Sequence, residues 1–269
     1  MQGPDHHCSV LASPWPGVYA AWTRSGRHFG RHSHGTFGVG VLQTGAQRSA
    51  SGRGVVDAFA GDLVATNPGE VHDGRPLAGP DRQWFTVYLE PEVLQAHGAR
   101  QADDMRITHP VLQDAELRSA LQALLQLLAN WPAPTVPKLA LDEALANACG
   151  QLLARHATQP VLAARADPAL SRVRDCLADR LADPPALDEL AALAGTGKYS
   201  LLRAFKRTFG VPPHAWLVQQ RAERARGLVA RGLSLADAAH AAGFADQSHM
   251  TRQFTRQFGF TPAAWRRAA

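Results

Sequence analysis

Hydrophobic and polar positions alternate in short runs along the first 90 residues and change to a helical spacing further on. The early runs are rich in Val, Phe, Trp and Tyr and are separated by Gly, Pro and Asp, a pattern typical of short strands joined by turns. Strands are predicted at residues 17–22, 36–42, 55–59, 62–66 and 83–89. Regularly spaced short strands favour a sandwich or a barrel.

From residue 114 onward, apolar residues recur every three or four positions, as they do on one face of a helix. This spacing predicts two amphipathic helices, at residues 114–130 and 138–156. Their apolar faces need a covering surface. We expect that surface to be a second copy of the chain in a homodimer, with the outside of the strand domain as the alternative.

The chain is long enough for about two domains. Residues 159–168 are rich in Ala and Pro and indicate a linker between residues 1–158 and residues 169–269. The second domain is predicted to begin with a helix at residues 169–181.

The last third of the chain contains an internal repeat. Residues Arg203–Trp216 reappear 49 positions later as Arg252–Trp265, with Arg, Phe, Arg, Phe, Gly, Pro, Ala and Trp in register. Each copy follows a short Ala-rich and Leu-rich segment ending in Gly, at Leu187–Gly195 and Leu235–Gly243. Helix, glycine turn and helix together form the helix-turn-helix pattern, so two such units are predicted.

At 100° per residue, the second helix of each unit has an apolar side and a basic side. The first unit turns Leu201 and Phe205 inward, and the second turns Met250 and Phe254 inward. The outer faces carry no acid, whereas a solvated helix face usually mixes both signs of charge. They are formed by Tyr199, Arg203, Lys206 and Arg207 in the first unit, and by Ser248, Arg252, Thr255 and Arg256 in the second.

Charge and spacing both favour DNA as the partner of these faces. Residues 1–165 hold 13 Lys and Arg against 14 Asp and Glu, whereas residues 166–269 hold 15 against 9. Basic side chains bind phosphates and release counterions. A helix predicted at 213–230 is about 27 Å long, enough to hold two recognition helices about one DNA turn, roughly 34 Å, apart.

At this point the sequence resembles the AraC/XylS family of bacterial transcription regulators. The most specific stretch is Gly243–Pro262, with Gly-Phe, then Ser, Phe, Phe-Gly and Pro as in the family signature. A departure is Gly197, where the family usually has a Ser that caps the helix. The resemblance implies base contacts at Lys198, Tyr199, Arg203, Gln247, Ser248, His249 and Arg252, and phosphate contacts at Lys206, Arg207 and Arg256.

The N-terminal half resembles the cupin barrel, the usual sensory domain of this family, through His32-Ser-His34 and residues 61–72. Alternation along a strand would place His32 and His34 on one face. Metal-binding cupins add a Glu after this pair, but Gly38 and Val39 stand there instead. We therefore predict an effector pocket without bound metal, with a metal site as the alternative. The predicted pocket residues are His32, His34, Arg48, His72, Trp84 and Tyr88. Hydrogen bonding within the barrel is the alternative for the three histidines, and an exposed or core position is the alternative for Arg48, Trp84 and Tyr88.

These observations predict an α+β multidomain protein with an N-terminal cupin-like β-barrel, flanking helices and a C-terminal all-α double helix-turn-helix domain. It would regulate transcription by binding double-stranded promoter DNA in response to a small-molecule effector, contacting RNA polymerase if it activates. No cofactor is expected. The alternative is a metal-dependent cupin enzyme fused to a DNA-binding domain. A third hypothesis is a DNA-repair methyl acceptor that carries the same domain, but it would need clustered cysteines, and the three cysteines of this chain are isolated.

Location follows from the chain's start and cysteine content. The N-terminus lacks a basic start followed by an apolar run, so no signal peptide is expected. The three cysteines are scattered, which favours a reducing compartment. No apolar run approaches the roughly 20 residues that cross a bilayer. The predicted location is the cytoplasm, with no membrane partner.

Overall fold

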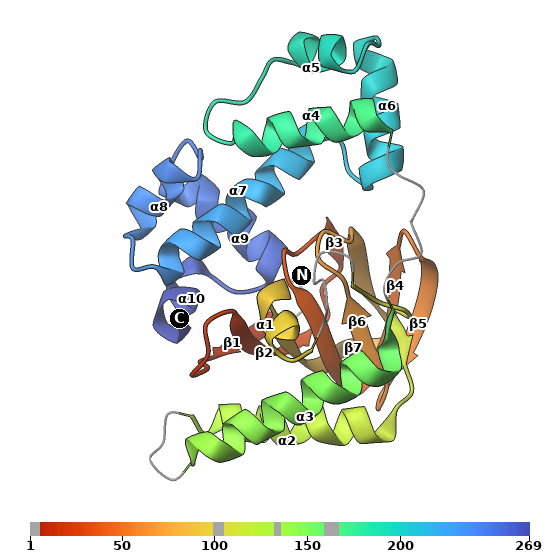
Figure 1. The fold of residues 1–269 in the computed structure, drawn as a ribbon, viewed down its shortest axis with the longest axis vertical. Coiled ribbons are helices and arrows are strands. Elements are labelled where there is room, and N and C mark those ends of the chain that lie inside the picture. Colours follow the sequence, from red (N-terminus) through yellow and green to blue (C-terminus); the bar gives the residue numbers. More distant parts are fainter. Residues whose placement is uncertain (1–5, 99–104, 132–135, 159–166) are drawn as a thin grey trace. The chain divides into compact units, whose positions relative to one another are not determined.

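The computed structural model describes residues 6–98, 105–131, 136–158 and 167–269. They divide into two compact units, one consisting mainly of residues 1–160 and the other mainly of residues 161–266. Most of the predicted linker, residues 159–166, lies outside the described part of the chain. The first unit is a strand-rich domain and the second is helical (Figure 1). The predicted α+β multidomain fold is confirmed.

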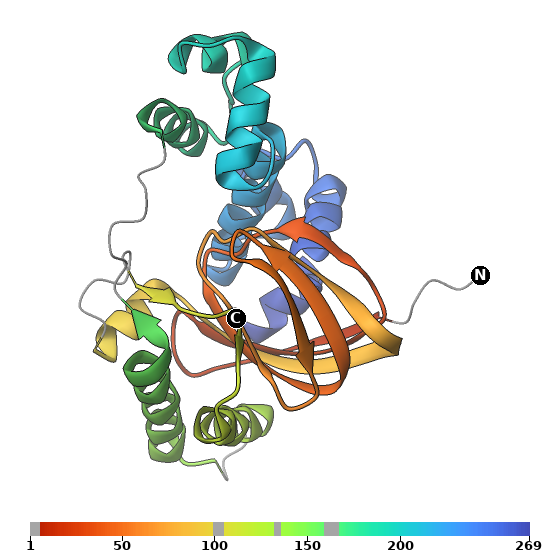
Figure 2. The same ribbon diagram turned by 90° about the vertical axis from the view of Figure 1, so that its right-hand side faces the viewer.

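The strand-rich unit holds an eight-stranded antiparallel sheet (Figure 2). The strand order is β1-β2-β7-β4-β6-β9, with β3 paired to β7 and β5 paired to β4. Strands β4 and β7 run well past their predicted limits, and β1 and β3 were not predicted. The strands are β1 (His6–Leu11), β2 (Val18–Ser25), β3 (Phe29–His32), β4 (Phe37–Ser51), β5 (Gly54–Phe59), β6 (Leu63–Thr66), β7 (His72–Leu89) and β9 (Val111–Leu112). A separate two-stranded sheet pairs β8 (Arg106–Ile107) with β10 (Ala157–Thr158).

Two long helices, α2 (Ala115–Ala129) and α3 (Lys138–His156), lie side by side against one face of the sheet (Figures 1 and 2). Their leucines form one continuous core with Val39, Val87 and Leu89 of the strands. The apolar faces of these helices are therefore covered by their own sheet. This arrangement is the alternative, predicted from the sequence, to a homodimer in which a second chain covers the two helices. The short helix α1 (Pro91–Ala96) follows β7 and adds Leu94 to the same core.

Helix α2 starts at Asp114, whose carboxylate accepts hydrogen bonds from the amides of Glu116 and Leu117. Two residues at the end of α3 also donate hydrogen bonds to this carboxylate: His156 through Nε2 at 2.8 Å and Arg155 through Nη1 at 3.2 Å. These hydrogen bonds hold the pKa of Asp114 well below its ordinary value. One acid thus caps one helix and ties down the end of the other.

The helical unit contains two helix-turn-helix pairs joined by a long helix. Its elements are α4 (Pro168–Asp179), α5 (Leu187–Leu193), α6 (Lys198–Phe209), α7 (Pro213–Ala230), α8 (Leu235–Ala241), α9 (Gln247–Phe258) and α10 (Pro262–Ala268). Helices α6 and α9 both end at a glycine in the left-handed conformation, Gly210 at φ 80° and Gly259 at φ 83°. A side chain at either position would strain the backbone, which explains why both copies of the repeat keep glycine.

No helix among the described residues is long and apolar enough to cross a membrane.

Candidate nucleic-acid interface and effector site

Helix α6 is the second helix of the first helix-turn-helix unit. Leu201 and Phe205 are completely buried, and Phe205 packs on Phe209 at 4.5 Å between ring centres. Arg203, Lys206 and Arg207 are exposed, as the helical spacing predicts. The helix starts at Gly197, which offers no side chain to cap the free amides of the first turn.

Helix α9 repeats this arrangement in the second unit. Met250 and Phe254 are completely buried. Unlike α6, α9 has a side-chain cap, because Asp246 accepts a 2.7 Å hydrogen bond from the amide of His249. Its start is therefore better fixed than that of α6. Four of the predicted contact residues are exposed on it: Gln247, Ser248, Arg252 and Arg256.

Three predicted base-contact residues differ from these. The ammonium of Lys198 forms an ion pair with Asp188 of α5 at 2.6 Å, so it is engaged within its own unit. The ring of His249 packs edge-on against Phe244 at 5.3 Å and is half-buried. The side chain of Tyr199 lies outside the described part of the structure.

The basic excess of this unit is only partly a surface charge. Arg221 of α7 donates to the backbone carbonyl of Leu181 at 2.7 Å, and Arg226 contacts Glu223 at 3.0 Å while its guanidinium lies over the ring of Trp265. These cations hold helices together. The sequence count of basic residues therefore overstates the charge that is free to meet a polyanion.

The sheet of the first unit has one polar face and one apolar face. Along β7, Val87 and Leu89 belong to the core shared with α2 and α3. Arg82, Trp84, Thr86 and Tyr88 alternate with them and share the opposite face. On the neighbouring strand β2, these four residues are paired, in the same order, with Ser25, Thr23, Ala21 and Tyr19. We call this surface the polar face of the sheet.

Arg82 is a feature of the polar face that the sequence analysis missed. Its side chain is 1% exposed and lies over the rings of Trp84 and Phe29, at 4.8 and 5.8 Å from their centres. Its Nε donates to Gln47 Oε1 at 2.8 Å, and its Nη1 donates to the backbone carbonyls of Ser25 and Arg27. Burial lowers the pKa of Arg82 to about 10, which leaves the group cationic at neutral pH.

No ion pair of the described residues includes Arg82, and its hydrogen-bond acceptors are all uncharged. A buried cation without an anion is costly. The signal that could have found Arg82 was its alternation with Trp84 and Tyr88. The predicted strand, however, began one residue too late, at Gln83.

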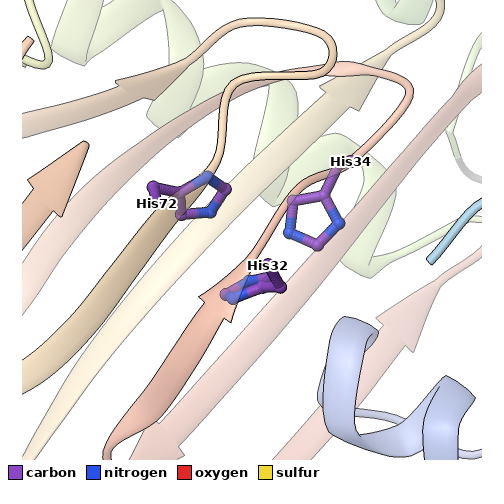
Figure 3. A group of neighbouring side chains, drawn as sticks. All are labelled: His32, His34 and His72. Atoms are coloured by element: carbon purple, nitrogen blue, oxygen red, sulfur yellow. The ribbon is translucent and has the colours of Figure 1, made fainter. Parts of the chain in front are cut away.

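Three predicted pocket residues, His32, His34 and His72, come together (Figure 3). One nitrogen from each ring lies within 4.8 Å of the others. The predicted reason was wrong, because β3 ends at His32 and His34 lies in the loop that follows. His72 opens β7, and burial lowers its pKa, which favours the neutral ring.

Tyr88 and Trp84 lie on the polar face, as a pocket requires. The Tyr88 ring stacks on Tyr19 at 4.6 Å and meets His34 at 5.7 Å. Burial raises its pKa, so the phenol stays protonated. Arg48 does not join them. Its guanidinium makes two 2.7 Å hydrogen bonds to Asp57 on the neighbouring strand and is 40% exposed. The pocket prediction for Arg48 is corrected accordingly.

Cys8 and Cys149 are not activated as nucleophiles. Cys8, Cys149 and Cys176 are all free thiols. Burial raises the pKa of Cys149 to about 12 and also raises that of Cys8, whereas a reactive thiol needs a lowered pKa. These values argue against the methyl-acceptor alternative.

Two helix-turn-helix units on a connecting helix, together with a sheet domain that has a polar face, define a DNA-binding transcription regulator with a sensory domain. Comparison with known families agrees for both halves. The AraC-like ligand binding domain matches residues 15–148, and a helix-turn-helix domain matches residues 190–268. The chain belongs to the AraC family of transcription regulators.

Relatives of known sequence are regulators as well. The chain is 26% identical to the uncharacterized HTH-type transcriptional regulator YbfI of Bacillus subtilis over 91% of its own length and 87% of that protein. It is 33% identical to the transcriptional activator NphR of Rhodococcus sp over 52% of its length, a match that spans 43% of NphR.

Solved structures share the fold across the whole chain. ToxT from Vibrio cholerae aligns with 98% of this chain and 97% of its own at a TM-score of 0.52, with 8% identity. The fatty-acid-bound form of ToxT aligns with 100% of this chain and 98% of its own at a TM-score of 0.52, with 11% identity. At these identities the likeness concerns the fold alone.

Proposed function

We propose that this protein binds double-stranded promoter DNA through α6 and α9, and that a small molecule held on the polar face of the sheet controls this binding. The observation that carries the proposal is the pair of matching exposed basic faces. Each basic face belongs to a helix that contains no Asp or Glu, and the opposite side of that helix carries a buried phenylalanine, Phe205 in α6 and Phe254 in α9. Helix α7 lies between the two units and is about 27 Å long, which suits two major-groove segments one turn apart.

Within this proposal Arg203, Gln247, Ser248 and Arg252 read base edges, with His249, Lys198 and Tyr199 as further candidates. Lys206, Arg207 and Arg256 contact phosphates. The protein acts in the cytoplasm without a catalytic role. If it activates transcription, it also contacts RNA polymerase. Pairing of two chains stays part of the proposal, although the apolar faces of α2 and α3 that suggested it are covered by the sheet.

Selection of binding sites from random double-stranded DNA tests the proposal, and the salt dependence of binding tests the phosphate contacts. Each neutralised phosphate adds about 0.9 to the slope of log affinity against log salt. Replacing Lys206, Arg207 and Arg256 together by alanine should lower the slope by about 3 per chain and weaken all sequences alike.

The control is Lys138→Ala, which removes an exposed cation from the sheet domain. It should leave both the slope and the selected motif unchanged. Failure to enrich any motif, or binding that does not respond to salt, would refute the DNA assignment.

We further propose that the effector carries an anionic group, such as a carboxylate, which pairs with Arg82. The support is a buried cation that lacks an anion, flanked by Trp84 and Phe29. A guanidinium binds a carboxylate through two parallel hydrogen bonds, and aromatic rings cover the apolar part of a ligand. Fatty-acid-bound ToxT has this fold with a carboxylic acid ligand.

The expected result is that wild-type protein distinguishes carboxylates from their neutral amides. Benzoate, phenylacetate and an unsaturated fatty acid are compared with the matching amides by calorimetry. A charge-assisted hydrogen bond contributes about 1.5–3 kcal/mol, so Arg82→Gln should weaken the best carboxylate roughly 10-fold to 100-fold and leave amide binding unchanged.

Arg48→Gln is the matched control, because that arginine already has Asp57 as its partner. It should keep the preference for carboxylates. Equal carboxylate affinity in wild type and Arg82→Gln would exclude Arg82 as the anion-binding group. If Arg82→Gln does not fold, Arg82→Lys supplies the test, because it keeps the charge and loses the two-pronged geometry.

A further inference from the structure

The three histidines at the end of the polar face form a group of nitrogen donors whose chemistry goes beyond the anion contact proposed for Arg82. His32 ends β3, His34 follows two residues later, and His72 opens β7, so two separate segments bring the rings together (Figure 3). One nitrogen of each ring lies within 4.8 Å of the other two. Three imidazoles gathered in this way can bind one ion.

The hydrogen bonding of His72 fixes which of its nitrogens can bind a metal. Its Nδ1 lies 2.8 Å from the backbone carbonyl oxygen of Glu70. A carbonyl oxygen can only accept, so Nδ1 carries the hydrogen and Nε2 presents a lone pair. Metal-binding histidines commonly have their second nitrogen held by a carbonyl or a carboxylate in this way.

Among the described residues the group contains three histidines and no carboxylate, so its donors are nitrogens. Both oxygens of Glu70 accept from Arg53 at 2.7 Å. Asp73 accepts from the amide of Ala50 at 2.8 Å. Magnesium and calcium require oxygen ligands, whereas imidazole suits zinc, copper, nickel and iron.

We propose that His32, His34 and His72 form a binding site for one divalent transition metal ion, of which Zn²⁺ is representative. Zinc–nitrogen bonds of about 2.0–2.1 Å place tetrahedral ligands about 3.4 Å apart, so each ring needs to move by less than about 1 Å. Three protein ligands leave a fourth position for water or for an oxygen of the effector. The Tyr88 ring packs on His34 and connects this site to the polar face.

This proposal differs from the sequence expectation of a metal-free pocket. That expectation rested on the missing acid after His34, since Gly38 and Val39 stand in its place. The structure adds that three nitrogens meet without the acid. A three-histidine site with an open position does not require a fourth protein ligand.

Metal titration of the full-length, untagged chain tests the proposal. The protein is stripped with a chelator and titrated with Co²⁺ while its visible absorption is recorded, and Zn²⁺ affinity is measured by competition with a chromophoric chelator. We expect one equivalent of metal per chain and a rise in melting temperature on loading. His32→Ala, His34→Ala and His72→Ala should each weaken Zn²⁺ binding at least about 10-fold.

The matched control is His109→Ala, an exposed histidine outside the group, which should keep full affinity. Circular dichroism of each variant checks the fold. X-ray absorption of the zinc-loaded wild-type chain counts imidazole ligands without any substitution, and three are expected. Less than about 0.1 equivalent bound, sulfur or oxygen ligands in place of imidazoles, or unchanged affinity in the folded variants would overturn the site.

Discussion

Replacing Phe254 by alanine is expected to lower the free energy of unfolding of the helical domain by about 3–5 kcal/mol. The side chain is completely buried, and its ring packs on Phe258 at 4.5 Å and on Phe260 at 5.9 Å. Little can move in to fill the space, because the neighbouring rings are themselves packed against each other and against Trp265. The free energy of unfolding of a domain is only about 5–15 kcal/mol, so this single substitution removes a large part of the stability of the helical domain.

The equivalent change in the first unit, Phe205→Ala, should have a similar cost, since that ring is also completely buried. Urea unfolding followed by circular dichroism and tryptophan fluorescence measures both. Phe59→Ala is the matched control, because Phe59 lies 55% exposed on β5 and its loss should stay within about 0.5 kcal/mol. A cost below about 1 kcal/mol for Phe254→Ala would contradict the packing described for the second unit.

Replacing Arg252 by alanine is expected to cost about 1–3 kcal/mol in binding to the selected DNA site and to relax the base preference at one position. An arginine fork on guanine supplies both energy and sequence information. Arg252 is exposed in the second turn of α9, whose start is fixed by the Asp246 cap. Arg203 occupies the matching place on α6, which starts at Gly197 without a side-chain cap.

Because the start of α6 is less firmly held, Arg203→Ala should cost less than Arg252→Ala. Gel-shift titration on the selected site gives the affinity, and renewed selection with each variant gives the base preference. Arg252→Lys keeps the positive charge and loses the fork, so it should relax the preference while leaving nonspecific binding close to wild type. An unchanged motif together with unchanged affinity in Arg252→Ala would show that α9 does not read bases.

The helical domain could be predicted from the sequence nearly residue by residue. Helix α7 has the predicted limits, residues 213–230, and both helix-turn-helix units form at the predicted places in the chain. Outside this domain, the helix at 138–156 that covers the sheet also has its predicted limits. A helix is made of contacts between residues three and four positions apart. The residues that determine its apolar spacing and its caps are therefore close together in the sequence. The same residue pattern also occurs twice, at 203–216 and 252–265, which makes a chance occurrence of the helix-turn-helix pattern improbable.

The sheet domain was predicted in outline only. Strand positions were right for five strands, but β7 starts at His72 and β1 and β3 were not recognised. Strand pairing joins residues far apart in the chain, and the extent of each strand depends on its partner. The prediction that Arg48 lines a pocket failed for this reason. Arg48 faces Asp57 across β4 and β5, and that register cannot be read from either strand alone.

The sequence by itself determined the two helix-turn-helix units, their basic faces and the family, because periodicity, capping and motif spacing act over a few residues. Tertiary structure decided which polar residues meet. It placed Arg82 among neutral partners on the polar face and gathered His32, His34 and His72 across a loop and a distant strand. It also covered the apolar faces of α2 and α3 with the sheet. These outcomes depend on the register and curvature of the sheet, which long-range packing sets.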